Sequence, residues 1–141
     1  MICVQCGSKN IKVTNSRPQV WTNRIWRRRH CQQCFTVFTT EESIDYSGAW
    51  RVKYQGNDLQ PFLRDKLLVS VLRSCGHRKN SLEDAQGLTD SIIYRLLKQT
   101  QDGIIEKDTI IQITKVALNR FDTAASVHYT AHHQSQSFSI R

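Results

Sequence analysis

Two short cysteine pairs, Cys3-Val4-Gln5-Cys6 and Cys31-Gln32-Gln33-Cys34, decide how the first part of this 141-residue chain folds. Two Cys-x-x-Cys pairs separated by 24 residues are typical of a structural zinc site. Each pair sits on a tight turn, and the four sulfurs together complete a tetrahedral shell of soft thiolate ligands, which suits Zn(II). The sequence therefore predicts that Cys3, Cys6, Cys31 and Cys34 bind one zinc ion.

Other uses of the cysteines stay open. Two disulfides would suit a secreted protein, but the chain shows no secretory segment before Cys3. A redox Cys-x-x-Cys pair would be expected to open a βαβ unit, which neither pair does. The residues after the pairs differ, because Gly7 tolerates a positive φ and Phe35 lacks that freedom. The fifth cysteine, Cys75, is expected to be buried on a helix.

Positive charge is concentrated around these cysteines. The chain has a net charge of +8, and residues 1–40 carry seven Lys and Arg residues and no Asp or Glu. Four thiolates and one Zn(II) would add −2, which leaves about +5 on this module. A small basic module with Trp21 and Trp26 among its arginines is typical of a nucleic-acid-binding surface. The expected DNA contacts are Lys12, Arg17, Arg24, Arg27, Arg28 and Arg29.

One or two of these arginines are expected to read guanine edges in the major groove, while the others contact phosphates. The alternative is that Arg27-Arg28-Arg29 is a solvated run without a partner.

The pattern predicts an α+β protein. We expect a three-stranded zinc ribbon over residues 1–46, a mainly helical domain with a small β element over 47–131, and a disordered tail over 132–141. The ribbon strands are expected at 11–13, 20–26 and 36–40, followed by a linker at 41–48. A module of this size buries little core, so a metal ion would stabilise it, whereas the remaining residues can fold on a hydrophobic core.

The second region is expected to open with a strand over residues 50–54 and a turn at Gly56. A first helix would begin near Pro61, a second near Ser81 and a third near Asp108, each with an apolar stripe. No apolar run is long enough to span a bilayer, so we expect a cytoplasmic protein whose thiols stay reduced.

A strand, a glycine turn and a helix start can together cradle a phosphate group. Lys53, Arg64 and Lys66 are placed to neutralise phosphate oxygens around the turn at Gly56. By itself this signal is weak, since a single glycine between a strand and a helix is usually only a turn. Catalysis is not expected, because the chain has no Walker A motif and a saturated zinc shell has no open position.

The chain resembles the NrdR family of repressors of ribonucleotide reductase genes, in which a zinc ribbon precedes an ATP-cone. In the first half the resemblance rests on Cys3-x-x-Cys6-Gly7, Val13, Ser16-Arg17-Pro18, Arg27-Arg28-Arg29, Cys31-x-x-Cys34 and Phe38-Thr39-Thr40. In the second half it rests on Val52-Lys53-x-x-Gly56, Pro61-Phe62 and Lys66-Leu67. The chain departs from the family at Tyr54-Gln55, where an Arg-Asp pair is usual, at Gln60, and at Phe35.

The resemblance implies that Val52, Lys53, Gly56, Phe62, Arg64 and Lys66 bind adenine nucleotides such as ATP and dATP. It further implies a repressor that binds operator DNA upstream of ribonucleotide reductase genes, with nucleotide selecting among homo-oligomers. One alternative is a nucleotide-sensing regulator that docks on a reductase and keeps the ribbon as a structural part. Another is a ribbon protein that binds RNA.

Overall fold

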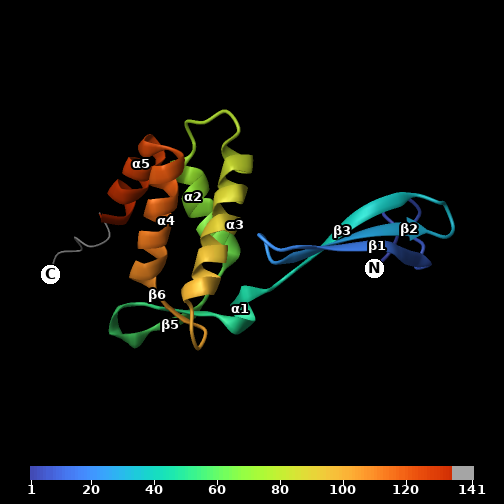
Figure 1. The fold of residues 1–141 in the computed structure, drawn as a ribbon, viewed down its shortest axis with the longest axis horizontal. Coiled ribbons are helices and arrows are strands. Elements are labelled where there is room, and N and C mark those ends of the chain that lie inside the picture. Colours follow the sequence, from blue (N-terminus) through green and yellow to red (C-terminus); the bar gives the residue numbers. More distant parts are fainter. Residues whose placement is uncertain (135–141) are drawn as a thin grey trace. The chain divides into compact units, whose positions relative to one another are not determined.

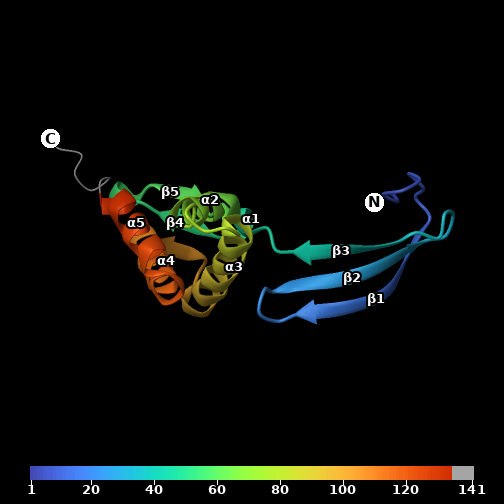
Figure 2. The same cartoon turned by 90° about the horizontal axis from the view of Figure 1, so that it is seen from above.

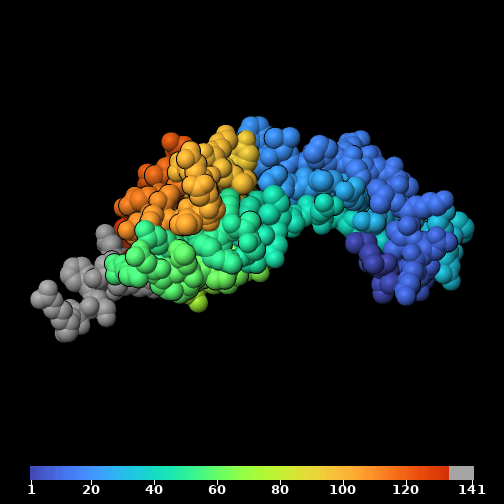
Figure 3. Space-filling model, turned by 90° about the horizontal axis from the view of Figure 1, so that it is seen from below, coloured from blue at the N-terminus to red at the C-terminus, as the bar shows by residue number. Residues whose placement is uncertain are grey.

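The computed structural model describes residues 1–134 and divides the chain into two compact units, Met1–Ile44 and Asp45 onward. Each unit is made from one continuous stretch of sequence, as the colours in Figures 1 and 3 show. None of the helices in the described residues combines the length and the apolar composition that a membrane span needs.

The first unit is a three-stranded antiparallel sheet, the zinc ribbon expected from the sequence (Figure 2). Its strands are β1 (Ile11–Gln19), β2 (Arg24–Cys31) and β3 (Val37–Ser43), in that order across the sheet. The second strand begins later than predicted, because residues 20–23 form the hairpin turn, in which Asn23 takes a φ of +51°. Asn is among the few residues that adopt this conformation readily. The third strand also continues into the stretch expected to be a linker.

The second unit begins with α1 (Tyr46–Ala49), which Asp45 caps by accepting a hydrogen bond from the Ser47 backbone N–H at 2.9 Å. A small sheet follows, in the order β5-β4-β6. The predicted strand is β4 (Arg51–Lys53), which pairs antiparallel with β5 (Leu59–Pro61) and parallel with β6 (Ile104–Glu106). The turn expected at Gly56 is formed by the short 3-10 helix η1 (Gln55–Asn57), in which Gly56 has a φ of +76°.

Four longer helices pack against one another beside this sheet (Figures 1 and 2). They are α2 (Arg64–Ser74), α3 (Ser81–Gln99), α4 (Lys107–Phe121) and α5 (Thr123–Gln134). Val71, Ile92, Leu96 and Leu118 are fully buried between them. At the sheet, Trp50 packs its ring 4.5 Å from that of Tyr46 and 5.3 Å from that of Phe62. These apolar contacts form one continuous core.

Helix α5 corrects the expected start of the disordered tail at His132, because residues 132–134 are helical. Asp122 starts this helix by accepting hydrogen bonds from the backbone N–H groups of Ala124 and Ala125 at 2.9 and 3.2 Å. Tyr129 is only 2% exposed and anchors the helix to the core. Residues 135–141 of the expected tail lie outside the described residues.

Candidate functional site

The four predicted ligand cysteines come together at one end of the ribbon. Their Sγ atoms all lie within 4.8 Å of one another, with Cys3 to Cys34 at 3.6 Å and Cys6 to Cys31 at 3.7 Å. A tetrahedral shell with Zn–S bonds of about 2.3 Å separates its sulfurs by about 3.8 Å, whereas a disulfide brings two sulfurs to about 2.05 Å. The cluster therefore fits Zn(II) and is not a pair of disulfides.

Two matching turns hold the cysteines. The Gly7 N–H donates to the Cys3 carbonyl at 3.0 Å, and the Phe35 N–H donates to the Cys31 carbonyl at 3.1 Å. Gly7 has a φ of +72° and Phe35 one of +60°, so Phe35 adopts the left-handed conformation that its side chain disfavours. Gly7 thus identified the first turn in the sequence. The turn after Cys31 adopts the same left-handed backbone conformation without a glycine, because both turns must direct their sulfurs to one cluster.

Polar groups around the cluster favour the thiolate form of two of the four cysteines, Cys31 and Cys34. The pKa of Cys6 is instead raised to about 12, because the lowering by the backbone N–H of Ser8 is outweighed by its contacts with the other cysteines and by burial. The hydroxyl and backbone N–H of Thr36 lower the pKa of Cys34 to about 6. The backbone N–H of Cys34 lowers the pKa of Cys31. Hydrogen bonds to the charged form of a group stabilise that form, and the thiolate is the form that binds metal.

The expected DNA contacts divide between the two faces of the ribbon. Neighbouring residues in a strand point to opposite faces, so Arg28 lies on one face and Arg27 and Arg29 lie on the other. Arg24 precedes Arg28 on β2 by an even number of residues, so it lies on the Arg28 face. Lys12 and Arg17 lie there too, because they pair with His30 and Trp26, which belong to the same face. We call the surface of Lys12, Arg17, Arg24 and Arg28 the open face, and the surface of Arg27 and Arg29 the tied face.

The two faces differ in how their arginines are bound. On the tied face, Arg27 contacts Glu42 at 3.0 Å and Ser16 Oγ at 2.9 Å, and Arg29 donates to Thr40 Oγ1 at 2.8 Å. On the open face, Arg24 approaches Glu41 at 3.5 Å, while Arg17 and Arg28 are exposed. The open face thus carries four basic groups against one carboxylate, and the tied face two against one.

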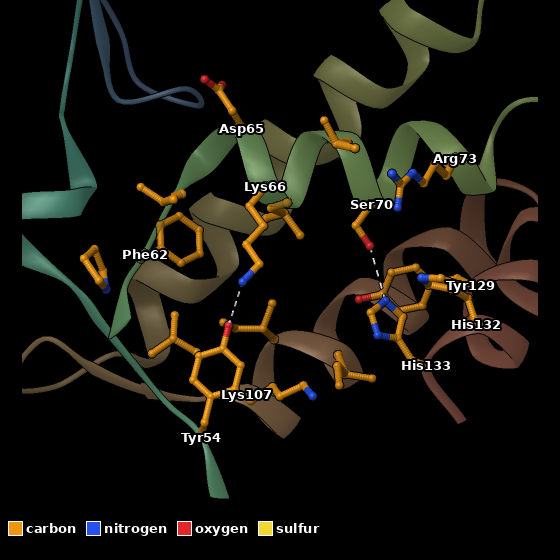
Figure 4. A pocket seen from close by; sticks show the side chains of 17 residues that line it. Tyr54, Phe62, Asp65, Lys66, Ser70, Arg73, Lys107, Tyr129, His132 and His133 are labelled. Atoms are coloured by element: carbon orange, nitrogen blue, oxygen red, sulfur yellow. Dashed lines mark hydrogen bonds between the residues drawn. The ribbon is translucent and has the colours of Figure 1, made fainter. Parts of the chain in front are cut away.

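The second unit contains a cavity of about 650 Å³ beside the small sheet (Figure 4). Its walls come from β4, the stretch leading to α2, and helices α2, α4 and α5. Among the described residues, three cationic side chains, Lys66, Arg73 and Lys107, line it together with a single carboxylate, Asp65. The arrangement therefore suits an anionic ligand with an apolar part, since Val52 and Phe62 also line it.

The structure brings only some of the predicted nucleotide-binding residues to this cavity. Val52, Phe62 and Lys66 line it. Lys53 follows Val52 on β4 and points to the opposite face of the sheet, where its Nζ lies 3.0 Å from Glu106. Arg64 joins α2 to α3 through a 2.8 Å contact with Asp90, and Gly56 lies in the turn at η1. Lys53, Gly56 and Arg64 are therefore outside the cavity wall.

Tyr54, noted above as a departure from the family, lies between two lysines of the cavity. Its hydroxyl accepts a hydrogen bond from Lys66 Nζ at 3.2 Å, and Lys107 Nζ lies 5.6 Å from the centre of its ring (Figure 4). Sequence reasoning also missed Arg73, Lys107 and the end of α5. The family motif covers only the strand and the start of α2, so it gave no signal for them.

The first 42 residues match the family model described as the N-terminal domain of NrdR-like transcriptional repressors, a zinc ribbon. Over 131 residues the chain is 34% identical to a protein named transcriptional repressor NrdR from Pelotomaculum thermopropionicum, covering 93% of this chain and 78% of that protein. The chain belongs to the NrdR family. A second NrdR, from Acetivibrio thermocellus, is 32% identical over 131 residues and 85% of its length. The NrdR from Staphylococcus carnosus is 35% identical over 108 residues, or 77% of this chain and 68% of that protein.

Membership of the NrdR family agrees with both units. The model for the NrdR ribbon covers nearly all of Met1–Ile44, including the four cysteines. The similarity to whole NrdR proteins extends well beyond the ribbon into the helical unit. These relatives are named as regulators of transcription and not as enzymes.

Proposed function

We propose that this NrdR-family protein is a zinc-dependent, adenine-nucleotide-responsive repressor that binds operator DNA upstream of ribonucleotide reductase genes. The observation that carries the proposal is the union, in one chain, of a basic ribbon with a four-cysteine cluster and a helical unit with a cationic cavity. In the cell the bound nucleotide selects the oligomer, and only some oligomers hold two ribbons at the spacing of the operator.

The open face of the ribbon is the surface that we assign to DNA. Arg17 and Arg28 are exposed there, and Trp26 pairs directly with Arg17 across the sheet. Arginines that are not held by a carboxylate lose little when they turn to a phosphate, whereas Arg27 would first have to leave Glu42. Arg27 and Arg29 instead fix the three strands to one another.

The cavity of the helical unit is the site that we assign to ATP and dATP. Lys66, Arg73 and Lys107 are placed to contact the phosphates, and Val52 and Phe62 offer apolar surface to the base. The cavity is large enough for a nucleotide, given the usual range of about 300–1,000 Å³ for ligand sites.

The decisive experiment measures binding to DNA from upstream of a reductase operon with no nucleotide, with ATP, and with ATP plus dATP. A repressor of this kind binds the duplex in a sequence-dependent manner, and its affinity and its size on a gel-filtration column change together with the nucleotide. Nucleotide binding without any affinity for duplex DNA would favour a regulator that docks on the reductase itself.

A further inference from the structure

Helix α5 places an unusual pair of side chains, His132 and His133, at the wall of the cavity. The Nε2 atom of His133 lies 3.2 Å from the hydroxyl of Ser70 on α2, as the dashed line in Figure 4 shows. On the other side its ring packs 4.2 Å from that of Tyr129 and 5.4 Å from that of His132. The imidazole of His133 is thus held from both α2 and α5.

The second ring nitrogen of His133, Nδ1, is buried and has no hydrogen-bond partner among the described residues. A buried polar atom without a partner costs free energy, and a ligand or water in the cavity can supply the missing contact. In the neutral imidazole only one nitrogen donates, whereas in the protonated ring both do. A protonated His133 can therefore keep Ser70 and donate from Nδ1 to an anion.

The charges that face His133 decide when it is protonated. Lys66, Arg73 and Asp65 face the cavity from α2, Lys107 from α4, and Tyr54 from the position directly after β4, while Tyr129 and His132 share α5 with His133. Burial lowers the pKa of His133, and His132 and Lys107 lower it further. An anion in the cavity acts in the opposite direction, because a nearby negative charge favours the charged imidazole.

We propose that His133 is a phosphate-binding residue of this cavity that takes up a proton when a polyphosphate ligand enters. This inference rests on the proposed function of the cavity and adds that its affinity for nucleotide depends on pH. As the pH falls from above to below the range in which histidines titrate, affinity rises and then levels off. One coupled proton gives a slope of up to about tenfold per pH unit.

The test is calorimetry of the full-length, zinc-loaded protein with ATP near pH 7, in two buffers that differ in ionisation enthalpy. The difference in heat gives the number of protons taken up. The matched control is His128→Gln, because His128 lies on the same helix but is exposed and away from the cavity. We expect the parent and H128Q to take up the same number of protons. H133Q should take up fewer, and its affinity should lose most of its dependence on pH between 6 and 8.

Protons that ATP itself exchanges cancel in the comparison between variants. Inorganic tripolyphosphate should give the same difference between parent and H133Q, because the phosphates are the groups that His133 contacts. Proton NMR of the parent provides a measurement that needs no substitution. The His133 ring signal should titrate at higher pH with ATP bound than without it.

Equal proton uptake by the parent and H133Q, an unchanged midpoint for the His133 signal, or no difference with tripolyphosphate would each overturn this inference alone. If the parent binds no adenine nucleotide at millimolar concentration, the nucleotide half of the proposed function fails as well.

Discussion

The ribbon and the helical unit bury very different sets of side chains. In the described part of the ribbon, the buried hydrophobic side chains are Cys3 and Cys31, and both belong to the metal cluster. The helical unit buries sixteen in one continuous cluster that includes Trp50, Phe62 and Leu118. One unit is therefore built around four sulfurs that fit a metal ion, and the other is held by apolar contacts. Substitutions of metal ligands and charged residues, and changes of pH, should therefore affect the ribbon and the helical unit differently.

Loss of zinc should have the largest effect, and it should be confined to the ribbon. Cys6→Ser, or a strong chelator, should release the metal and unfold residues 1–44, since structural zinc supplies about 10–16 kcal/mol in small metal-bound modules. Two-dimensional NMR should show the ribbon signals collapse while those of the helical unit stay in place. Cys75→Ser is the control, because Cys75 is buried in the helical core, and its variant should keep about one zinc per chain. Equal zinc content in the Cys6 and Cys75 variants would contradict the assignment.

The two faces of the ribbon provide the next comparison. Replacing both Arg17 and Arg28 by Ala should abolish most DNA binding. It should also reduce the slope of log affinity against log salt concentration by about two units, close to one for each phosphate contact. Replacing Arg27 and Arg29 by Ala removes the same charge from the tied face and should leave the slope nearly unchanged, although it should lower the thermal stability of the ribbon. Equal slopes for the two double variants would show that the open face is not the DNA surface.

Acid should act on the two units in sequence. In the helical unit, His77 and Arg78 lie 2.9 Å from Asp122, and together with the backbone N–H groups that Asp122 caps they lower its pKa. A lowered pKa stabilises the fold above the ordinary carboxyl value of about 4, and that contribution is lost as the pH falls below it. The ribbon should unfold first as the pH falls. Protons compete with zinc for its thiolates at a higher pH than the one at which Asp122 is protonated.

Circular dichroism and zinc release, followed from pH 7 to 2, should therefore show two separate transitions. Asp122→Asn should move only the second one, because the asparagine side chain keeps a capping oxygen but does not titrate. A single transition for zinc and helix would contradict this order.

The two cysteine turns should give the smallest effect. Phe35→Gly relieves a positive φ and should tighten zinc binding by about 1 kcal/mol, or roughly fivefold, in a chelator competition. Gly7→Ala should weaken it by a similar amount through the backbone alone, since a Cβ at Gly7 would meet no atom within 4 Å. Unchanged zinc affinity in both variants would mean that the turns carry no strain.

Patterns with a strong local cause could be predicted from the sequence. The spacing of the cysteines predicted the four-sulfur cluster, and the periodicity of apolar residues predicted helices α2, α3 and α4. Strands β5 and β6 were not predicted, because three residues are too few to show an alternation of apolar and polar side chains. Placing the second ribbon strand at 20–26 also hid the alternation through Arg27-Arg28-Arg29, which assigns neighbouring arginines to opposite faces.

The cavity could be predicted only in part. Val52, Phe62 and Lys66 belong to a motif within one short stretch, and they do line it. Lys107 and His133 come from helices far along the chain, and only tertiary packing brings them to the same wall. Lys53 belongs to the same motif and was also assigned by its charge, yet the alternation of β4 turns it away toward Glu106.

The parallel pairing of β4 with β6 has a consequence for the order in which the helical unit forms. It joins Val52 to Ile105, so more than 50 residues, including all of α2 and α3, lie in the loop that this pairing closes. Closing a long loop costs chain entropy that local helices do not have to overcome, so contacts of this kind tend to be made late. Because Val52 and Tyr54 also line the cavity, the nascent protein should form its helices before the wall of this cavity is complete.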